Sequence, residues 1–335
     1  MNGAQVTEIF AGVGFSEVLR PLGLHGPGLE MDPAACATRR AAGHWTIECD
    51  VTRHPTEPFA GTGGLVGGPP CPPFGKSGRR LGLTDLPLVH EAIDSLARGR
   101  DTRAAHAAGC LDARSILTAE PMRWLYDLRP AWVVLEQVPS VLPVWGHYAE
   151  ILGDWGYSTA AGVLHAERHG AGQKRPRALL LASRVREVSL PASTHGGPGQ
   201  PPLVAMADVV GWGYTRRPSP AVTGGGVYTG GAEPFGNGSR QAMRKVIGTD
   251  AWRDRAPLCV QCAEGGERDP AEPCKHLRPS LAECAALQGF RPDLVFLGRS
   301  GQRHLQVGNA VPKALALAAV LAASGVGERG EVLAA

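Results

Sequence analysis

Residues 5–14, QVTEIFAGVG, decide the fold. Gln5 to Phe10 are predicted to form a short strand, a turn with Gly12 and Gly14 follows directly, and an apolar pattern after the turn predicts a helix. Glycines at such a junction let the backbone approach a ligand closely, as in folds that bind dinucleotides. Because Glu17 replaces the third glycine of the dinucleotide pattern, such a junction by itself is more often a plain tight turn.

The next two predicted strands each end in an acidic residue. The second strand ends at Glu30, Asp32 begins a helix, and the third strand, Trp45 to Cys49, is followed by Asp50. In folds that bind nucleosides, an acid at the tip of the second strand holds the ribose diol. Charge complementarity at a helix N-terminus is the alternative for Glu30, although Asp32 already fills that role. Three strand ends at one sheet edge therefore predict a nucleoside pocket.

A cysteine between two diprolines follows the fourth predicted strand, Leu65 to Gly67. In residues 67–75, GGPPCPPFG, the prolines fix φ and prevent a helix from continuing, so Cys71 is expected on a rigid, extended turn. Reactive thiols need such a held, partly exposed position, whereas a proline-rich surface loop with an incidental thiol is the alternative. The turn is expected at the same sheet edge as the acids.

The middle of the chain adds a long segment and more strands. Residues 75–114 are polar and basic with weak helical patterning near Val89, which predicts a long functional loop. A buried strand at Ala131–Leu135 ends at Glu136, again a carboxylate at a strand tip. Further strands are predicted at Thr159–His165 and Ala178–Ala182.

The length, net charge and cysteine content of the chain limit the class of protein to which it can belong. A chain of 335 residues has room for one large domain and a smaller one, and its net charge of +3 is too small to indicate a partner. With no basic-then-apolar leader and no apolar run long enough to cross a membrane, we expect a cytoplasmic protein. Eight cysteines then indicate reduced thiols, catalysis or a metal site rather than disulfides.

Six blocks of the chain, in order, resemble the motifs of the S-adenosylmethionine-dependent cytosine-5 DNA methyltransferases of the bacterial or phage type. They are residues 10–14 (FAGVG), 70–71 (PC), 136–138 (EQV), 173–177 (QKRPR), 281–290 (LAECAALQGF) and 306–312 (QVGNAVP). The resemblance implies an α/β fold with a Rossmann-like methyltransferase sheet, helices on both faces, and a smaller, irregular β-rich target-recognition domain. It places the catalytic domain at 1–188, completed by 300–335, and the target-recognition domain at 189–299.

The resemblance also implies the roles of site residues. A thiolate adding at cytosine C6 makes C5 nucleophilic, and charge moves toward N3 and O2. The implied catalytic residues are the nucleophile Cys71, Glu136 at N3, Arg177 near O2, and Arg175 beside the thiol. The implied S-adenosylmethionine site consists of Phe10, Gly12, Gly14, Glu30, Met31, Asp50 and Asn309. Without the resemblance, the arginines fit strand-edge charges, and Asn309 fits a left-handed turn residue after Gly308.

Two departures from the family pattern keep other functions open. Gln137 stands where the family usually has Asn, and Pro72 and Gly75 stand where it usually has Gln and Ser. Gln keeps an amide donor and acceptor, so we expect activity to survive. The alternatives are methylation of tRNA cytosine, which some relatives perform, and a catalytically silent DNA-binding relative.

The expected partner is double-stranded DNA. A cytosine in duplex DNA must be flipped out of the stack, and the basic loop from Lys76 to Arg103 is expected to close over it. Residues 216–255 carry seven basic residues against three acids, which suits a polyanion, although a solvated charged face is the commoner explanation. A monomer is expected, and a cognate restriction endonuclease encoded elsewhere is left open.

A metal site is predicted within the target-recognition region. The spacing Cys259-x2-Cys262-x11-Cys274-x-His276 places four zinc ligands in a short span, although the second pair is tighter than usual. Four unpaired residues in a loop are the alternative.

Overall fold

A seven-stranded sheet forms the centre of the protein in the computed structural model, which describes residues 5–75, 79–211, 216–224 and 279–327. Its order is β3-β2-β1-β4-β5-β7-β6. The strands are β1 Val6–Ile9, β2 Gly28–Glu30, β3 Thr46–Glu48, β4 Gly64–Gly67, β5 Trp132–Gln137, β6 Ser158–His165 and β7 Pro176–Ser183. Strands β1 to β5 pair in parallel, whereas β7 runs antiparallel to β5. All seven predicted strands are confirmed.

The chain divides into two compact units. The first consists of residues 1–164, 176–192 and 315–335, and contains nearly all of the sheet. The second consists of residues 165–175 and 193–314. The sequence placed these boundaries at 188 and 300, and it missed that residues 165–175 belong to the second unit.

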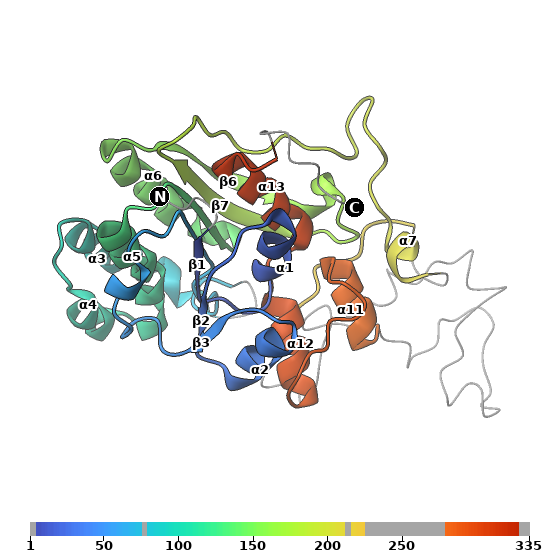
Figure 1. Ribbon diagram of the computed structural model, residues 1–335, viewed down its shortest axis with the longest axis horizontal. Coiled ribbons are helices and arrows are strands. Elements are labelled where there is room, and N and C mark those ends of the chain that lie inside the picture. The colour runs from blue at the N-terminus through green and yellow to red at the C-terminus, as the bar shows by residue number, and fades with distance from the viewer. Residues whose placement is uncertain (1–4, 76–78, 212–215, 225–278, 328–335) are drawn as a thin grey trace. The chain divides into compact units, whose positions relative to one another are not determined.

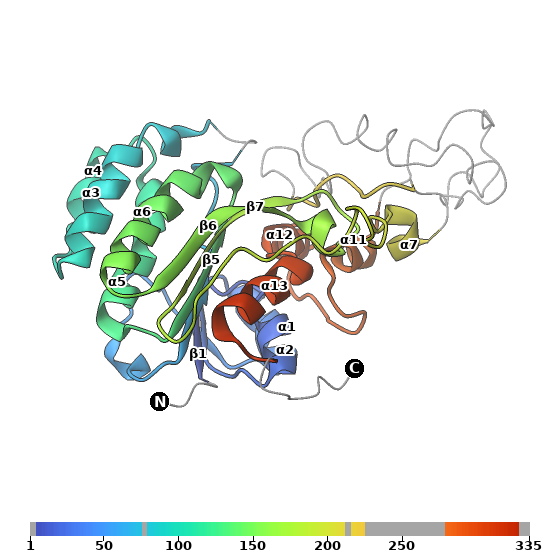
Figure 2. The same cartoon turned by 90° about the horizontal axis from the view of Figure 1, so that it is seen from above.

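Helices cover both faces of the sheet in the first unit (Figures 1 and 2). On one face lie α1 Ser16–Leu19, α2 Pro33–Ala41 and α13 Lys313–Ser324. On the other lie α3 Leu86–Ala97, α4 Arg103–Gly109, α5 Glu120–Leu128 and α6 Leu142–Asp154. Leu65 and Val133 from the strands pack with Ile93, Leu125 and Trp145 from these helices in a buried core. The fold is thus the Rossmann-like arrangement that the sequence predicted.

The expectation of a long functional loop from residue 75 to 114 is wrong for most of its length, although the weak helical pattern near Val89 does mark a helix. Residues 86–97 form α3, which buries Val89, Ile93 and Leu96 against the sheet. These residues recur at helical spacing, so core burial outweighs the polar composition of the surrounding sequence. Arg103, which was assigned to DNA phosphates, lies 2.6 Å from Asp101 and also pairs with Glu120.

Helices dominate the described part of the second unit. They are α7 Met206–Val210, α11 Leu281–Gln288 and α12 Ser300–Asn309. Ser280 and Glu283 form a capping box that begins α11, as the pattern Ser-x-x-Glu favours. Val222 and Thr223, whose β-branched side chains favour a short strand, do not form one, and the described β pairing of this unit is the isolated bridge between Gln173 and Ser219. Residues 225–278, the larger part of the expected β-rich region, lie outside the described residues.

Within the described ranges, we find no single helix that is both long and apolar enough to cross a membrane.

Candidate active site

One edge of the sheet gathers most of the predicted site residues. Because β1 to β5 are parallel, their carboxyl ends meet at this edge, and the antiparallel β7 begins there. The edge therefore carries, in chain order, Phe10, Gly12, Gly14, Glu30, Met31, Asp50, Cys71, Glu136 and Arg177. Arg175 and Asn309 belong to the second unit.

The turn after β1 has an unusual backbone. Phe10 and Gly12 both have φ of 50°, in the left-handed region. For a bulky residue such as Phe10 this conformation costs roughly 1–3 kcal/mol, and it persists only where the surroundings enforce it. A Cβ at Gly12 would meet no described atom within 4 Å, so the absent side chain leaves open space beside the turn. That space suits the close approach of a ligand.

Glu30 binds the backbone around this space. One carboxylate oxygen accepts from the Gly12 N–H at 2.8 Å, and the other accepts from Met31 at 2.9 Å and Asp32 at 2.8 Å. A carboxylate offers about four lone-pair sites, so the oxygen that faces Gly12 keeps one for a ligand hydroxyl. Met31 next to it is 67% exposed, an apolar surface on which a planar base can pack.

Asp50 lies two residues after the end of β3, and its two carboxylate oxygens have different surroundings. Its Oδ1 accepts from the Thr52 amide at 3.0 Å and from the Thr52 hydroxyl at 2.7 Å. Its Oδ2 lies 3.6 Å from Arg53 Nε and is half-exposed, so it can still accept from an amino group. Together, Gly12, Glu30, Met31 and Asp50 fit a nucleoside with a free ribose diol and an exocyclic amine, as S-adenosylmethionine has.

The cysteine turn after β4 is closed by its own backbone. The Cys71 carbonyl accepts from the Phe74 and Gly75 amides, each at 2.9 Å. Phe74 is fully buried, and the Gly82 amide donates to the Pro73 carbonyl at 3.0 Å. The thiol therefore lies on a turn that is fixed on its C-terminal side, as the diprolines predicted.

Gln137, the last residue of β5, and Ser140, which follows the strand, hold the same turn. The buried Gln137 amide donates to the Pro69 carbonyl and accepts from the Val138 N–H. Ser140 donates to the Phe74 carbonyl at 2.8 Å. The amide donor and the amide acceptor of Gln137 are thus both used. Sequence reasoning missed Ser140, because nothing local distinguishes it from a loop serine.

We expect Gln137→Ala to slow reaction at Cys71 by about tenfold, because it leaves the Pro69 carbonyl and the Val138 amide without partners. The rate of a thiol-specific alkylation at Cys71, followed by mass spectrometry, measures this effect. Gln137→Asn is the matched variant, since it retains both polar groups, and it should react within about threefold of wild type. Equal rates in all three proteins would contradict a role for Gln137 in holding the turn.

Glu136 and Arg177 form an ion pair at the same edge. Arg177 Nε lies 2.6 Å from Glu136 Oε1, and both side chains are largely buried. The register explains the contact: Glu136 is opposite Leu179, so Arg177 is its diagonal neighbour on the same face. A Cβ at Gly68 would lie only 3.2 Å from Glu136 Oε2, which places this carboxylate directly beside the backbone that leads to Cys71.

The guanidinium of Arg175 contacts backbone of the second unit. Its Nη1 donates to the Val222 carbonyl at 2.5 Å, and its Nη2 donates to the carbonyls of Gly308 at 2.5 Å and Ala310 at 3.1 Å. These contacts give Arg175 a structural role. Its predicted action on the thiol of Cys71 stays a prediction.

Asn309 ends helix α12, and the alternative of a left-handed turn residue is wrong. The helix continues through Gly308 and Asn309, and Ala310 leaves it in an extended conformation. A Cβ at Gly308 would lie 1.9 Å from the Gly224 nitrogen, so this glycine permits close backbone packing. The role of Asn309 in cofactor binding stays a prediction.

Burial disfavours the other described cysteines as nucleophiles. It raises the pKa of the Cys36 thiol to about 11 and that of Cys284 to about 12. The pKa values of the Cys49 and Cys110 thiols are also raised, mainly by burial and to a smaller extent by nearby carboxylates. Because the thiolate is the reactive form, these four thiols are poorly reactive at neutral pH.

The predicted zinc ligands Cys259, Cys262, Cys274 and His276 lie outside the described residues. Across the part of the chain that is described, no group of three or more His, Cys, Asp or Glu side chains comes close enough to hold a metal. The zinc site stays a prediction from spacing.

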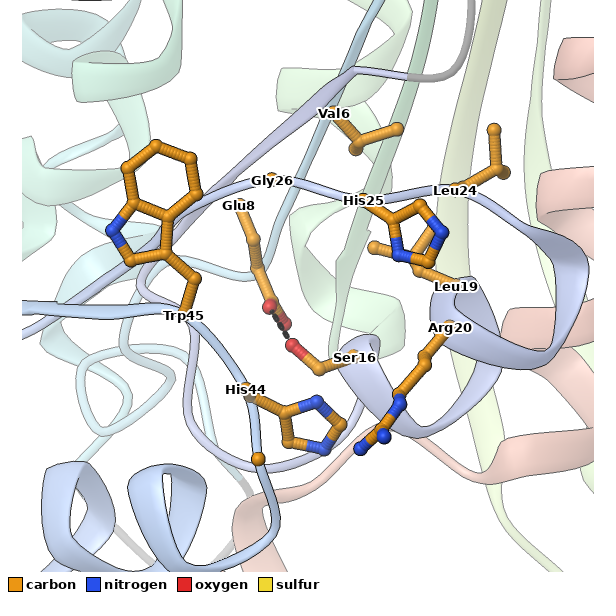
Figure 3. Close-up of a pocket in the computed structure, with 11 residues that line it drawn as sticks. Val6, Glu8, Ser16, Leu19, Arg20, Leu24, His25, Gly26, His44 and Trp45 are labelled. Carbon is orange, nitrogen blue, oxygen red and sulfur yellow. Dashed lines mark hydrogen bonds between the residues drawn. The ribbon is translucent and has the colours of Figure 1, made fainter.

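A separate pocket of about 210 Å³ lies at the opposite, amino-terminal edge of the strands (Figure 3). It is lined by residues that precede β2 and β3, among them His25 and Trp45, together with Glu8 and Ser16, which point toward each other. None of the predicted site residues lines it. The nucleoside site and this pocket are therefore different places.

Comparison with known proteins agrees with these features. Residues 103–198, which include Glu136, Arg175 and Arg177, match the family described as C-5 cytosine-specific DNA methylase. The chain is 28% identical to the type II methyltransferase M.NaeI of Lentzea aerocolonigenes, over 94% of this chain and 73% of that protein. It is 33% identical to the type II methyltransferase M.NgoMIV of Neisseria gonorrhoeae, over 52% of this chain and 50% of that protein.

Solved structures of methyltransferases share the fold. The S. pombe Dnmt2 methyltransferase aligns over 98% of this chain and 99% of its own, with a TM-score of 0.60 at 14% identity. The Entamoeba histolytica methyltransferase EhMeth aligns over 95% and 96%, with a TM-score of 0.57 at 11% identity. These structures show a shared fold, and by sequence the chain matches the C-5 cytosine-specific DNA methylase family over residues 103–198 and is similar to type II methyltransferases over most of its length.

Proposed function

We propose that this DNA cytosine-5 methyltransferase acts through a covalent bond between Cys71 and C6 of a cytosine that has been flipped out of duplex DNA. The observation that carries the proposal is the Glu136–Arg177 pair beside Gly68, at the edge where the Cys71 turn begins. The type II methyltransferase relatives support DNA as the substrate.

The ion pair matches the polar edge of cytosine. N3 and O2 are attached to the same ring carbon, so the groups that bind them must be neighbours, as Glu136 and Arg177 are. Addition of the Cys71 thiolate to C6 breaks the C5–C6 double bond and moves negative charge toward N3 and O2. A carboxyl at N3 and a guanidinium at O2 stabilise this charge in a partly buried site, where such interactions are strong.

The cofactor residues complete the site. The Gly12 turn, Glu30, Met31 and Asp50 would hold the adenosine part of S-adenosylmethionine. When bound, S-adenosylmethionine supplies an electrophilic methyl group for C5. After methylation, the C5 proton leaves to a base or water, and elimination of the Cys71 thiolate restores the aromatic ring. The target base must be outside the stack, because C6 is shielded within the duplex.

The two rival functions are separated by one pair of assays. We expect purified chain to transfer tritiated methyl groups from S-adenosylmethionine to duplex DNA at least about tenfold faster than to tRNA. Bisulfite sequencing of host DNA after expression should then show one methylated sequence. Methylation of tRNA alone would favour the tRNA enzyme, and no transfer to either substrate would favour a silent DNA-binding relative.

We place target recognition in residues 189–299, and zinc on Cys259, Cys262, Cys274 and His276. The monomeric state, the cytoplasmic location and a cognate restriction endonuclease stay predictions.

A further inference from the structure

A buried arginine on α2 connects the glycine turn to the sheet. Arg39 is 1% exposed, and its Nη1 donates to the carbonyl of Gly12 at 3.1 Å and to that of Ala11 at 3.5 Å. Its Nε donates to Thr46 Oγ1 at 3.2 Å, at the start of β3. Its Nη2 lies 3.0 Å from Glu8 Oε2, within β1. One guanidinium thus joins the turn after β1 to two strands.

The partner of Arg39 is equally buried. Glu8 is 2% exposed, and Ser16 on α1 donates to the same carboxylate oxygen that faces Arg39 (Figure 3). Buried charges are costly unless they are paired and hydrogen-bonded, so the three side chains form a unit. The planar guanidinium can contact a carboxylate and two carbonyls at the same time, which the single ammonium of Lys cannot do in this geometry.

The turn that Arg39 contacts is the strained one. Phe10 and Gly12 have φ of 50°, and such a turn needs surroundings that enforce it. Arg39 binds its carbonyls, while Glu30 accepts from the Gly12 N–H at 2.8 Å. The two charged side chains therefore fix opposite polar groups of the same residue.

Gly28 on β2 makes room for this arginine. A Cβ at Gly28 would lie 1.9 Å from Arg39 Nη2 and 2.5 Å from its Cζ. A glycine within a strand often marks close approach of another group, and here that group is the guanidinium.

We propose that Arg39 is a positioning residue for cofactor binding: it fixes the carbonyls of Ala11 and Gly12 so that the turn is preformed for S-adenosylmethionine. This inference rests on the proposed function of the site. Arg39 acts through the turn and needs no contact with the cofactor or the reacting base.

Two variants test the role of the guanidinium. Arg39→Lys keeps a cation beside Glu8, and Arg39→Met combined with Glu8→Gln removes both charges, so no buried charge is left alone. Both should raise the Kd for S-adenosylmethionine by about tenfold to a hundredfold, and leave the Kd for DNA without cofactor unchanged. Arg40→Met is the matched control, since Arg40 follows on the same helix but is half-exposed and pairs with Glu48. It should bind both ligands as wild type does.

Hydrogen exchange of the protein without ligand separates positioning from general stability. In the Arg39 variants we expect faster amide exchange at residues 10–14 and unchanged exchange in β4 and β5. Gly28→Ala should reproduce this pattern, and should add little to the Arg39→Met, Glu8→Gln protein, where the guanidinium is absent.

Wild-type cofactor affinity in the Arg39 variants, or faster exchange across the whole sheet, would overturn the proposal. If wild-type protein itself does not bind S-adenosylmethionine, the proposed function fails, and the exchange pattern still decides whether Arg39 holds the turn.

Discussion

Cys71→Ala is expected to abolish methyl transfer, with a loss of at least about 10⁴-fold, because it removes the thiol that the proposed covalent step requires. Duplex DNA that contains 5-fluorocytosine provides a direct measurement. With the target hydrogen replaced by fluorine, the cysteine cannot be eliminated, so wild-type protein should give a complex that survives denaturation. Cys71→Ala should give none.

Cys110→Ser is the matched control for this experiment. Cys110 has intermediate exposure like Cys71, and it lies at the end of α4. The variant should form the denaturation-resistant complex at the wild-type rate. A complex that persists in Cys71→Ala would refute Cys71 as the nucleophile, and its peptide map would identify the residue that is attached.

Disruption of the Glu136–Arg177 pair is expected to slow the chemical step with little change in cofactor affinity. Glu136→Gln keeps the shape but loses the acid, and Arg177→Met loses the cation. Each should lower the single-turnover rate by about 10²- to 10³-fold. The two groups act on N3 and O2, which are attached to the same carbon of one base. The single-turnover rate of the double variant should therefore fall by far less than the product of the two single-variant factors.

Arg184→Met serves as the control for the ion pair. Arg184 directly follows β7 at the opposite end of the strand from Arg177, and it binds the Arg129 carbonyl. Its loss should leave the single-turnover rate within about twofold of wild type. If Glu136→Gln and Arg177→Met instead react as fast as the control in a single turnover, that result would show that the pair is structural and does not bind the base.

Parts of the site followed from the sequence because they are local. The glycines after β1, the acids at the ends of β2 and β3, and the cysteine after β4 each follow a short strand directly. Parallel strands bring their carboxyl ends together, so the order of motifs along the chain was enough to predict one edge. The same local reasoning failed for residues 75–114, where the apolar residues of α3 are scattered among polar ones and the core decides their conformation.

The sequence by itself determined the parallel sheet and the edge at which the glycine turn, the acids and Cys71 lie, since these depend on residues within one strand and its following turn. Only the tertiary structure decided what holds that edge in place. Arg39 reaches the Gly12 turn across 27 residues, Gln137 reaches Pro69 across 68, and Arg175 reaches Gly308 across 133. Such contacts join side chains to backbone carbonyls, which every residue has, so no residue type in the sequence marks the acceptor.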